Sequence, residues 1–150
     1  MRRQVREKAL QVLYQKDLLD VPLREIFLRM DLPEIWSEDD RSFFYRLTSG
    51  VADQLTSIDR ILTAYTEGWT LPRMPAIDRN ILRIAVFEIF FLPEISLKVA
   101  INEAVILGKK FGSEDSGRFI NGVLGRVART TMHEERETLR DKTGEEDVHH

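Results

Sequence analysis

Five residues in two separate groups have side chains that could bind a nucleic acid. Arg2, Arg3 and Arg6 lie close together near the N-terminus, and cations of this kind contact phosphate groups. Arg118 and Phe119 are adjacent further along the chain, and an arginine beside an aromatic ring can hold an unpaired base by charge and by stacking. Each group also has a plainer interpretation, because charges often lie on a solvated helix surface and aromatic rings often lie in the core.

Residues that commonly carry out catalysis are scarce in this sequence. Cysteine is absent, which excludes disulfides and thiolate metal sites. His133 is the only histidine before the last two residues, and no serine has a convincing histidine partner. Glu114 and Asp115 are adjacent carboxylates, but acidic residues are typical of the first turn of a helix. The glycines do not follow a phosphate-loop or dinucleotide-binding pattern. We therefore expect no enzymatic activity, no cofactor and no metal.

A pair of helices within residues 99–128, joined by a sharp corner, would position the second group. Apolar residues recur at helical spacing on both sides of this corner. Gly112 is predicted to end the first helix in the left-handed conformation. Ser113 is predicted to cap the second helix. Lys109 and Lys110 fall in the last turn of the first helix, where the helix dipole favours cations.

The three arginines would lie at the start of a helix over residues 3–19. A short helix is expected with Pro22 in its first turn and Asp20 as its cap. The acid-rich segment Ser37–Asp40 is predicted to open a longer helix. Gly50 interrupts that helix and would allow a close helix contact.

Residues 76–92 are apolar nearly all round, which is typical of a central helix. Glu88 interrupts this apolar surface and would need a partner if it is buried. The sequence contains no strand-like alternation and no repeat. We predict an all-α protein of about seven helices in a single domain, built as two small bundles that share a core.

The charge of the chain is divided unevenly along its length. The net charge is −3, but seven acidic and three basic residues fall within 134–147. Nineteen basic and 18 acidic residues remain outside that stretch, so any nucleic-acid site must be a local patch. We predict an all-helical domain over residues 1–132 and a charged, acidic, partly disordered tail over residues 133–150. No targeting or membrane-spanning segment is evident, and a cytoplasmic location is expected.

Five sequence blocks, in order, resemble the NusB family of bacterial transcription antitermination and termination factors. The resemblance extends over about residues 2–129. The blocks are RQVREKALQVLY (Arg3–Tyr14), WTLPRM (Trp69–Met74), IDRNILRIA (Ile77–Ala85), VAINEAV (Val99–Val105) and KKFGSEDSGRFINGVL (Lys109–Leu124).

This resemblance implies a non-catalytic, all-helical protein that acts on the transcription elongation complex. It implies binding of boxA-type nascent RNA jointly with NusE, a ribosomal protein of the small subunit. The residues that match the family's RNA-binding positions are Arg2, Arg3, Arg6, Asp115, Ser116, Arg118, Phe119 and Asn121. The residues that match the expected NusE face are Tyr14, Leu18 and Asp78.

The sequence departs from the family pattern at two positions. Gln4 stands where many members carry a basic residue, which makes the basic patch thinner, and Ser96 stands where a proline is usual. Three alternatives stay open. The chain could be the RNA-binding module of an rRNA-methyltransferase-type system, although no S-adenosylmethionine-binding region follows in the sequence. It could be a helical protein-interaction scaffold. Tyr14 and Leu18 could also pair with a second copy in a homodimer.

Overall fold

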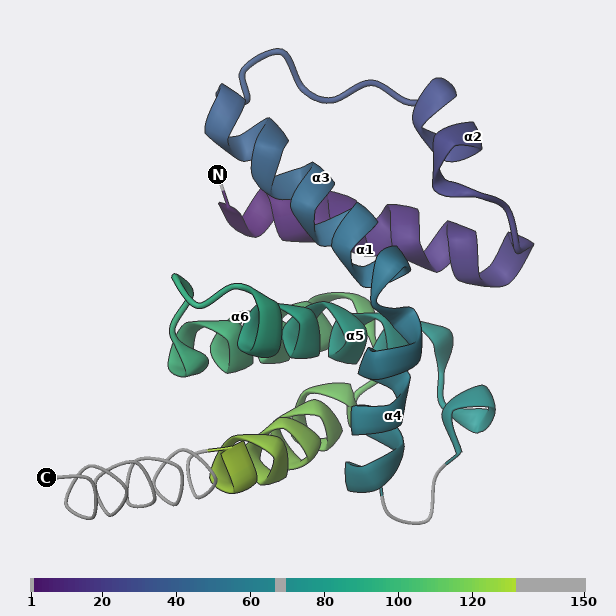
Figure 1. Ribbon diagram of the computed structural model, residues 1–150. Helices are drawn as coiled ribbons and strands as arrows, with labels where there is room; N and C mark the ends of the chain where they lie inside the picture. Colours follow the sequence, from purple (N-terminus) through teal and green to yellow (C-terminus); the bar gives the residue numbers. More distant parts are fainter. Residues whose placement is uncertain (1, 67–69, 132–150) are drawn as a thin grey trace, which may run out of the picture.

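The computed structural model describes residues 2–66 and 70–131, and these residues form an all-α fold, as predicted (Figure 1). No strand occurs within these two ranges. A short 3-10 turn, η1, precedes the central helix, and a last helix runs over residues 116–131. The labelled elements are α1 (Arg2–Leu19), α2 (Leu23–Leu28), α3 (Glu38–Asp53), α4 (Leu55–Tyr65), η1 (Leu71–Arg73), α5 (Ala76–Phe91) and α6 (Leu97–Phe111).

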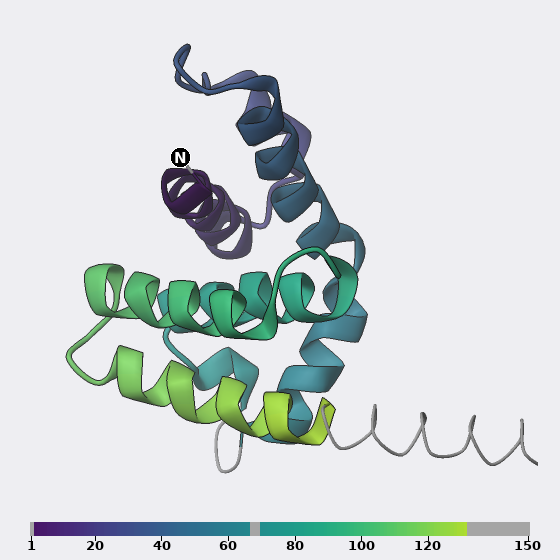
Figure 2. The same cartoon turned by 90° about the vertical axis from the view of Figure 1, so that its left-hand side faces the viewer.

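Two groups of helices share one core, with α5 packed against both. Helices α1, α2 and α3 form one group, and α5 contacts α1 and α3 of that group as well as α4 and α6. The helix over residues 116–131 lies on the far side of the α5–α6 layer from α1 and α3 (Figures 1 and 2). This arrangement confirms the prediction of two small bundles. Among the described residues, no helix is long and apolar enough to span a membrane.

Local sequence rules account for some helix boundaries and fail at others. The segment Ser37–Asp40 opens α3 as predicted. Ser37 is its cap, because its side chain accepts from the Asp40 backbone N–H and the Asp40 side chain accepts from the Ser37 N–H. The prediction that Asp20 caps α2 is wrong. Pro22 occupies the N-cap position, and Asp20 instead turns the chain with a φ of 52°. An aspartate tolerates this left-handed conformation better than most residues.

The central helix α5 is buried along most of its length, as its composition predicts. Its Phe87 ring lies against Gly50 of α3, where an added Cβ would collide with the ring. The predicted close contact at Gly50 is therefore confirmed. Glu88 is also buried, and its partner is Arg6 of α1. The expected acidic tail and His133 lie outside the described residues.

Candidate nucleic-acid interface

The corner after α6 gathers four of the sequence-predicted site residues around one pocket. The pocket has a volume of about 260 Å³, and Asp78, Asp115, Ser116 and Phe119 line it. Asp78 comes from the first turn of α5, and the other three come from the corner and the helix that follows it. The remaining lining residues were not anticipated from the sequence; they are Met74, Pro75 and Ser113.

Backbone and hydroxyl hydrogen bonds fix the shape of this corner. The Ser113 N–H donates to Ser116 Oγ at 2.9 Å, and Ser116 Oγ donates to Asp78 Oδ1 at 2.7 Å. Ser116 is 1% exposed and Asp78 is 4% exposed. These two side chains therefore hold the corner against α5 rather than facing solvent.

Two local predictions about the corner need correction. Gly112 is not left-handed, because its φ is −91° and its ψ is −166°. A glycine is needed there for space, since an added Cβ would collide with the Ser116 side chain. Ser113 is not the N-cap of the next helix. The Phe119 N–H donates to the Asp115 carbonyl, which makes Asp115 the cap residue.

The exposed members of the corner share one edge of the last helix. Asp115, Arg118 and Asn121 are all exposed and follow one another at three-residue spacing, so they lie on one side of the helix. Phe119 is partly buried and packs against the core while also lining the pocket. Its ring is therefore partly a core residue, and stacking on a base stays a prediction.

The three arginines of α1 are each bound to a carboxylate from a different helix. Arg6 is 3% exposed, and its guanidinium contacts Glu88 of α5 at 2.6 Å. The expectation that Arg6 belongs to an exposed basic cluster is therefore wrong. The sequence holds a signal for this position, because Arg6 lies three residues before the buried Ala9 and seven before the buried Leu13.

Arg2 and Arg3 remain accessible at the surface. Arg3 donates through Nε and Nη2 to both carboxylate oxygens of Glu103, at 3.0 and 3.1 Å. These hydrogen bonds hold the pKa of Glu103 below its ordinary value. The Arg2 guanidinium lies 4.3 Å from the centre of the Phe43 ring and 3.6 Å from an Asp39 carboxylate oxygen.

Helix α6 connects the arginine end of α1 with the corner. Glu103, in the middle of α6, holds Arg3, while the corner begins immediately after Phe111. A second ion pair, from Lys110 Nζ to Glu7 Oε1 at 2.8 Å, joins the same two helices nearer the corner. Glu103 and the end of α6 at Phe111 are eight residues apart, so about 12 Å of helix separates the two predicted halves of the RNA site.

The residues predicted to bind NusE are partly brought together. Tyr14 is half-buried and lines a trough of about 500 Å³ together with Ile77, Phe111 and Trp36. The Nε1 of Trp36 is buried and has no hydrogen-bond partner among the described residues. Leu18, which is 55% exposed, lies one turn beyond Tyr14 on α1 but does not line the trough.

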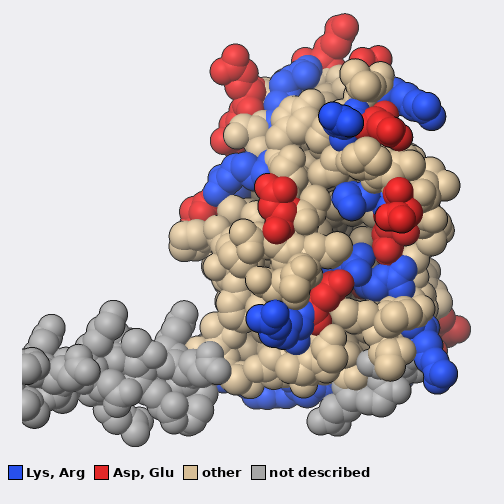
Figure 3. All heavy atoms as spheres, turned by 45° about the vertical axis from the view of Figure 1, so that its right-hand side comes forward, with Lys and Arg blue, Asp and Glu red and all other residues tan. Residues whose placement is uncertain are grey.

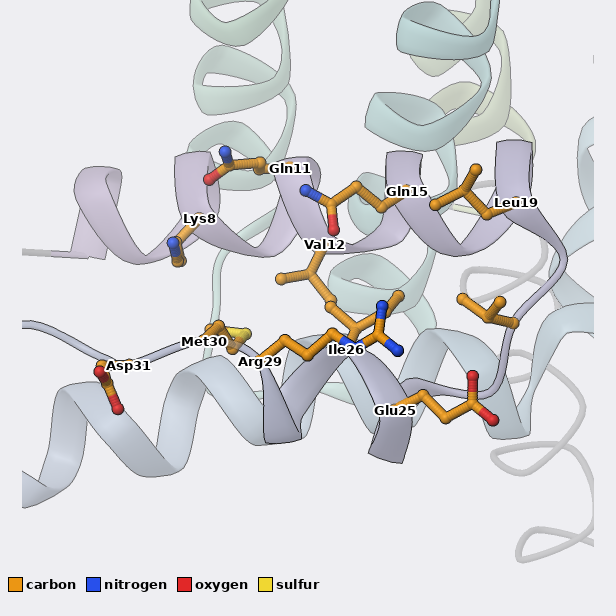
Figure 4. Close-up of a pocket in the computed structure, with 11 residues that line it drawn as sticks. Lys8, Gln11, Val12, Gln15, Leu19, Glu25, Ile26, Arg29, Met30 and Asp31 are labelled. Atoms are coloured by element: carbon orange, nitrogen blue, oxygen red, sulfur yellow. The ribbon is translucent and has the colours of Figure 1, made fainter.

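A further cleft lies between α1 and α2, with a volume of about 320 Å³ (Figure 4). Lys8 and Gln15 reach into it from α1, and Arg29 reaches into it from the end of α2. Glu25 and Asp31 also line it, so its charges are mixed. None of the sequence-predicted site residues contributes to this cleft.

The distribution of charge on the surface agrees with a local site for nucleic acid rather than a general one. On the face shown in Figure 3, basic and acidic side chains are interspersed and form no extended patch of one sign. Within the described ranges, no cluster of histidine, cysteine, aspartate or glutamate could hold a metal ion.

Comparisons with known proteins point to one family. The model of the NusB family matches residues 3–129. The transcription antitermination protein NusB of Pelotomaculum thermopropionicum is 44% identical over 126 residues, which cover 84% of this chain and 88% of that protein. The NusB of Salinispora arenicola is 43% identical over 131 residues, covering 85% of this chain and 94% of that protein.

Solved structures show the same fold. NusB from T. maritima superposes with a TM-score of 0.80 and 34% identity, covering 86% of this chain and 91% of that chain. A structure of the antitermination factors NusB and NusE in complex with dsRNA includes a chain with a TM-score of 0.77 and 28% identity. That match covers 86% of this chain and 96% of that one.

Proposed function

The chain belongs to the NusB family, and we propose that it is a transcription antitermination factor that binds boxA-type nascent RNA together with NusE. The relative that was solved with NusE and dsRNA supports this proposal. The observation that carries it is that α6 lies between the two regions: its Glu103 holds Arg3 of α1, and the corner that forms the pocket follows directly after its last residue. A single RNA strand passing along α6 would meet both.

The two regions have different tasks in this proposal. Arg2 and Arg3 contact phosphates, which fixes the position of the RNA without reading its sequence. Asp115, Arg118 and Asn121 contact base edges, and a base stacks on the exposed part of the Phe119 ring. These assignments follow from which side chains are accessible.

Three of the expected contact residues take supporting roles instead. Arg6 fixes the position of α1 through its buried pair with Glu88. Ser116 and Asp78 hold the corner in the shape that presents its exposed edge. Their effect on RNA binding is then indirect, through the positions of Arg3 and Phe119.

NusE is proposed to dock on the outer face of α1, on Tyr14, Leu18 and the trough beside them. Leu18 is a large apolar side chain exposed to solvent, and the trough lining is mostly apolar. Ile77 places the first turn of α5, and so Asp78, next to this surface.

The test is a titration of boxA-type RNA with and without NusE at two salt concentrations. We expect NusE to tighten binding, and log affinity to fall with log salt by about 0.7 for each phosphate contact with single-stranded RNA. The absence of any gain from NusE, or of a salt slope, would contradict the proposal.

Two alternative functions can be distinguished from the proposed one by simple assays. A methyltransferase-type module would support methyl transfer to rRNA in the presence of S-adenosylmethionine, and we expect none, because the proposed factor is non-catalytic. A pure protein scaffold would keep its partners when Arg2 and Arg3 are changed to glutamate, whereas we expect RNA binding to be lost. The proposed factor acts in the cytoplasm on the transcription elongation complex.

A further inference from the structure

Lys110 lies between the two proposed RNA-contacting regions and has no assigned role. It belongs to the last turn of α6, and its side chain is 57% exposed. Its Nζ is 2.8 Å from Glu7 Oε1 of α1. Seven residues separate Lys110 from Glu103, which corresponds to about 10 Å along the helix. Lys110 therefore occupies the gap between Arg3 and the corner.

The neighbouring Lys109 extends this row of cations toward the last helix. An added Cβ at Gly117 would lie 2.9 Å from Lys109 Cγ, so the stem of Lys109 lies across Gly117. Lys110 thus reaches toward α1 while Lys109 reaches toward the helix that carries Arg118. Arg3, Lys110, Lys109 and Arg118 therefore form a series of cations that leads from α1 past the end of α6 to the last helix.

From this arrangement we propose that Lys110 binds an RNA phosphate between the two regions, and that Glu7 competes with the RNA for it. This inference rests on the proposed function, because it concerns how the same RNA crosses α6. In the free protein, Glu7 accepts a hydrogen bond from the Lys110 ammonium group. The ion pair is partly exposed to water, where such pairs are weak. A phosphate of the incoming strand displaces Glu7 at little cost.

The geometry distinguishes Glu7 from Glu103, which pairs with Arg3. Arg3 uses Nε and Nη2 for Glu103, so a planar guanidinium can still present its Nη1 donors to a phosphate. Glu103 therefore orients Arg3 while RNA is bound. Lys110 is a point charge on a flexible stem, so Glu7 gives it little orientation. Glu7 therefore mainly competes with the RNA phosphate for Lys110 and repels that phosphate.

The experiment measures binding of a fluorescent boxA-type RNA to the full chain with NusE, by anisotropy at several salt concentrations. We expect Lys110→Gln to weaken binding roughly three- to tenfold and to reduce the salt slope by about 0.7. The matched control is Lys98→Gln, an exposed lysine in the first turn of the same helix, which should stay within about twofold of the unaltered chain because it contacts no phosphate.

A double-mutant cycle tests the competition by Glu7. Glu7→Gln should bind RNA roughly two- to fivefold more tightly than the unaltered chain, and this gain should vanish when Lys110→Gln is also present. A gain that persists in the double variant would mean that Glu7 acts only through general charge, which overturns the competition. Thermal unfolding of each variant confirms that the fold is kept.

The possible outcomes distinguish the inference about Lys110 from the proposed function on which it rests. If the unaltered chain binds RNA with NusE and Arg3→Ala weakens that binding, but Lys110→Gln changes neither affinity nor salt slope, the role of Lys110 is refuted and the proposed function stands. If the unaltered chain with NusE binds no boxA-type RNA, both are refuted.

Discussion

At the scale of single residues, Ser116 connects three parts of the chain. Its Oγ accepts from the Ser113 N–H, lies 3.2 Å from Ser113 Oγ and donates to Asp78 Oδ1. A buried carboxylate needs such a donor, because water cannot replace it there. The exposed edge of the last helix is therefore set in place before any RNA arrives.

Removing the Ser116 hydroxyl should destabilise the fold. Ser116→Ala leaves Asp78 buried without this donor, and we expect the free energy of unfolding to fall by about 1–3 kcal/mol. Urea denaturation measures the change. Ser113→Ala is the matched control, since Ser113 is exposed and its Oγ lies against the Ser116 hydroxyl rather than against a buried carboxylate. Equal losses in the two variants would argue against the support role of Ser116.

A substitution that keeps an apolar side chain at Phe119 can distinguish stacking on a base from packing against the core. Phe119→Leu keeps an apolar side chain against the core, so unfolding should change by less than about 1.5 kcal/mol. If a base stacks on the ring, RNA binding should weaken by about 1–3 kcal/mol. Anisotropy titrations with boxA-type and scrambled RNA measure this. Unchanged affinity in a stable variant would remove Phe119 from the base contacts.

At the scale of elements, three arginines near the start of α1 form ion pairs with three other helices. Arg2 pairs with Asp39 of α3, Arg3 with Glu103 of α6, and Arg6 with Glu88 of α5. Only the last pair is buried. The cations at the start of α1 therefore hold the helix against its neighbours, in addition to the RNA contacts proposed for Arg2 and Arg3.

The buried pair should be costly to break from one side. Arg6→Ala leaves Glu88 charged and unpaired in the core, and we expect a loss of about 3–5 kcal/mol in unfolding free energy. Arg3→Ala breaks a pair at the surface, where ion pairs are weak, and should cost much less. Chemical denaturation compares the two. The double variant Arg6→Met with Glu88→Met should recover most of the loss, which a role in RNA contact alone would not predict.

A second link between α1 and α5 makes stability depend on pH. Arg79 Nη2 lies 2.6 Å from Asp17 Oδ2, and Asn80 Nδ2 lies 3.0 Å from it. Burial acts to raise the pKa of Asp17, but the hydrogen bonds from Arg79 and Asn80 and the charge of Arg83 outweigh it. The pKa therefore lies below its ordinary value.

The sign of this pH effect follows from linkage. A carboxylate with a lowered pKa stabilises the fold above the pKa of the unfolded chain, about 3.9 for aspartate, and this contribution is lost as the pH falls through the folded pKa. Unfolding free energies measured by urea from pH 7 to pH 2 should therefore decrease less steeply in Asp17→Asn than in the unaltered chain. Parallel curves would show that Asp17 does not titrate with folding.

At the scale of the whole molecule, α1 offers different surfaces at its two ends. Arg3 and the α6 row lie at its start, while Leu18 lies near its end, about 22 Å further along the helix. The proposed RNA surface and the exposed Leu18 therefore lie toward opposite ends of α1. The trough between them is lined by Glu7 and Phe111 as well as by Tyr14.

Leu18→Asp tests this division of surfaces. Because Leu18 is 55% exposed, unfolding should change by no more than about 0.5 kcal/mol. Binding of NusE, measured by calorimetry, should weaken strongly, since a carboxylate would be buried in an apolar contact. RNA binding without NusE should stay the same. Size-exclusion chromatography of both chains shows whether Leu18 supports a homodimer instead.

The sequence by itself determined the helices, most of the core and the family. Apolar residues at helical spacing predicted α1, α3 and α5, because this periodicity is a property of each segment alone. The start of α3 at Ser37–Asp40 was predictable for the same reason. Ordered motifs over residues 3–129 identified the family. Asp115, Arg118 and Asn121 are exposed at the corner, and their contact with RNA stays a prediction.

Only the tertiary structure decided what each polar residue of the site does. Arg6 turns inward to Glu88, 82 positions away, and Lys110 meets Glu7 across 103 positions. Such pairings depend on how helices pack, and no local pattern specifies them. Asp78 and Ser116 were predicted as contacts, but packing of α5 against the corner buries both. The sequence does not show whether a charged side chain faces water or a carboxylate of another helix. The burial of that side chain in the folded protein distinguishes the two cases.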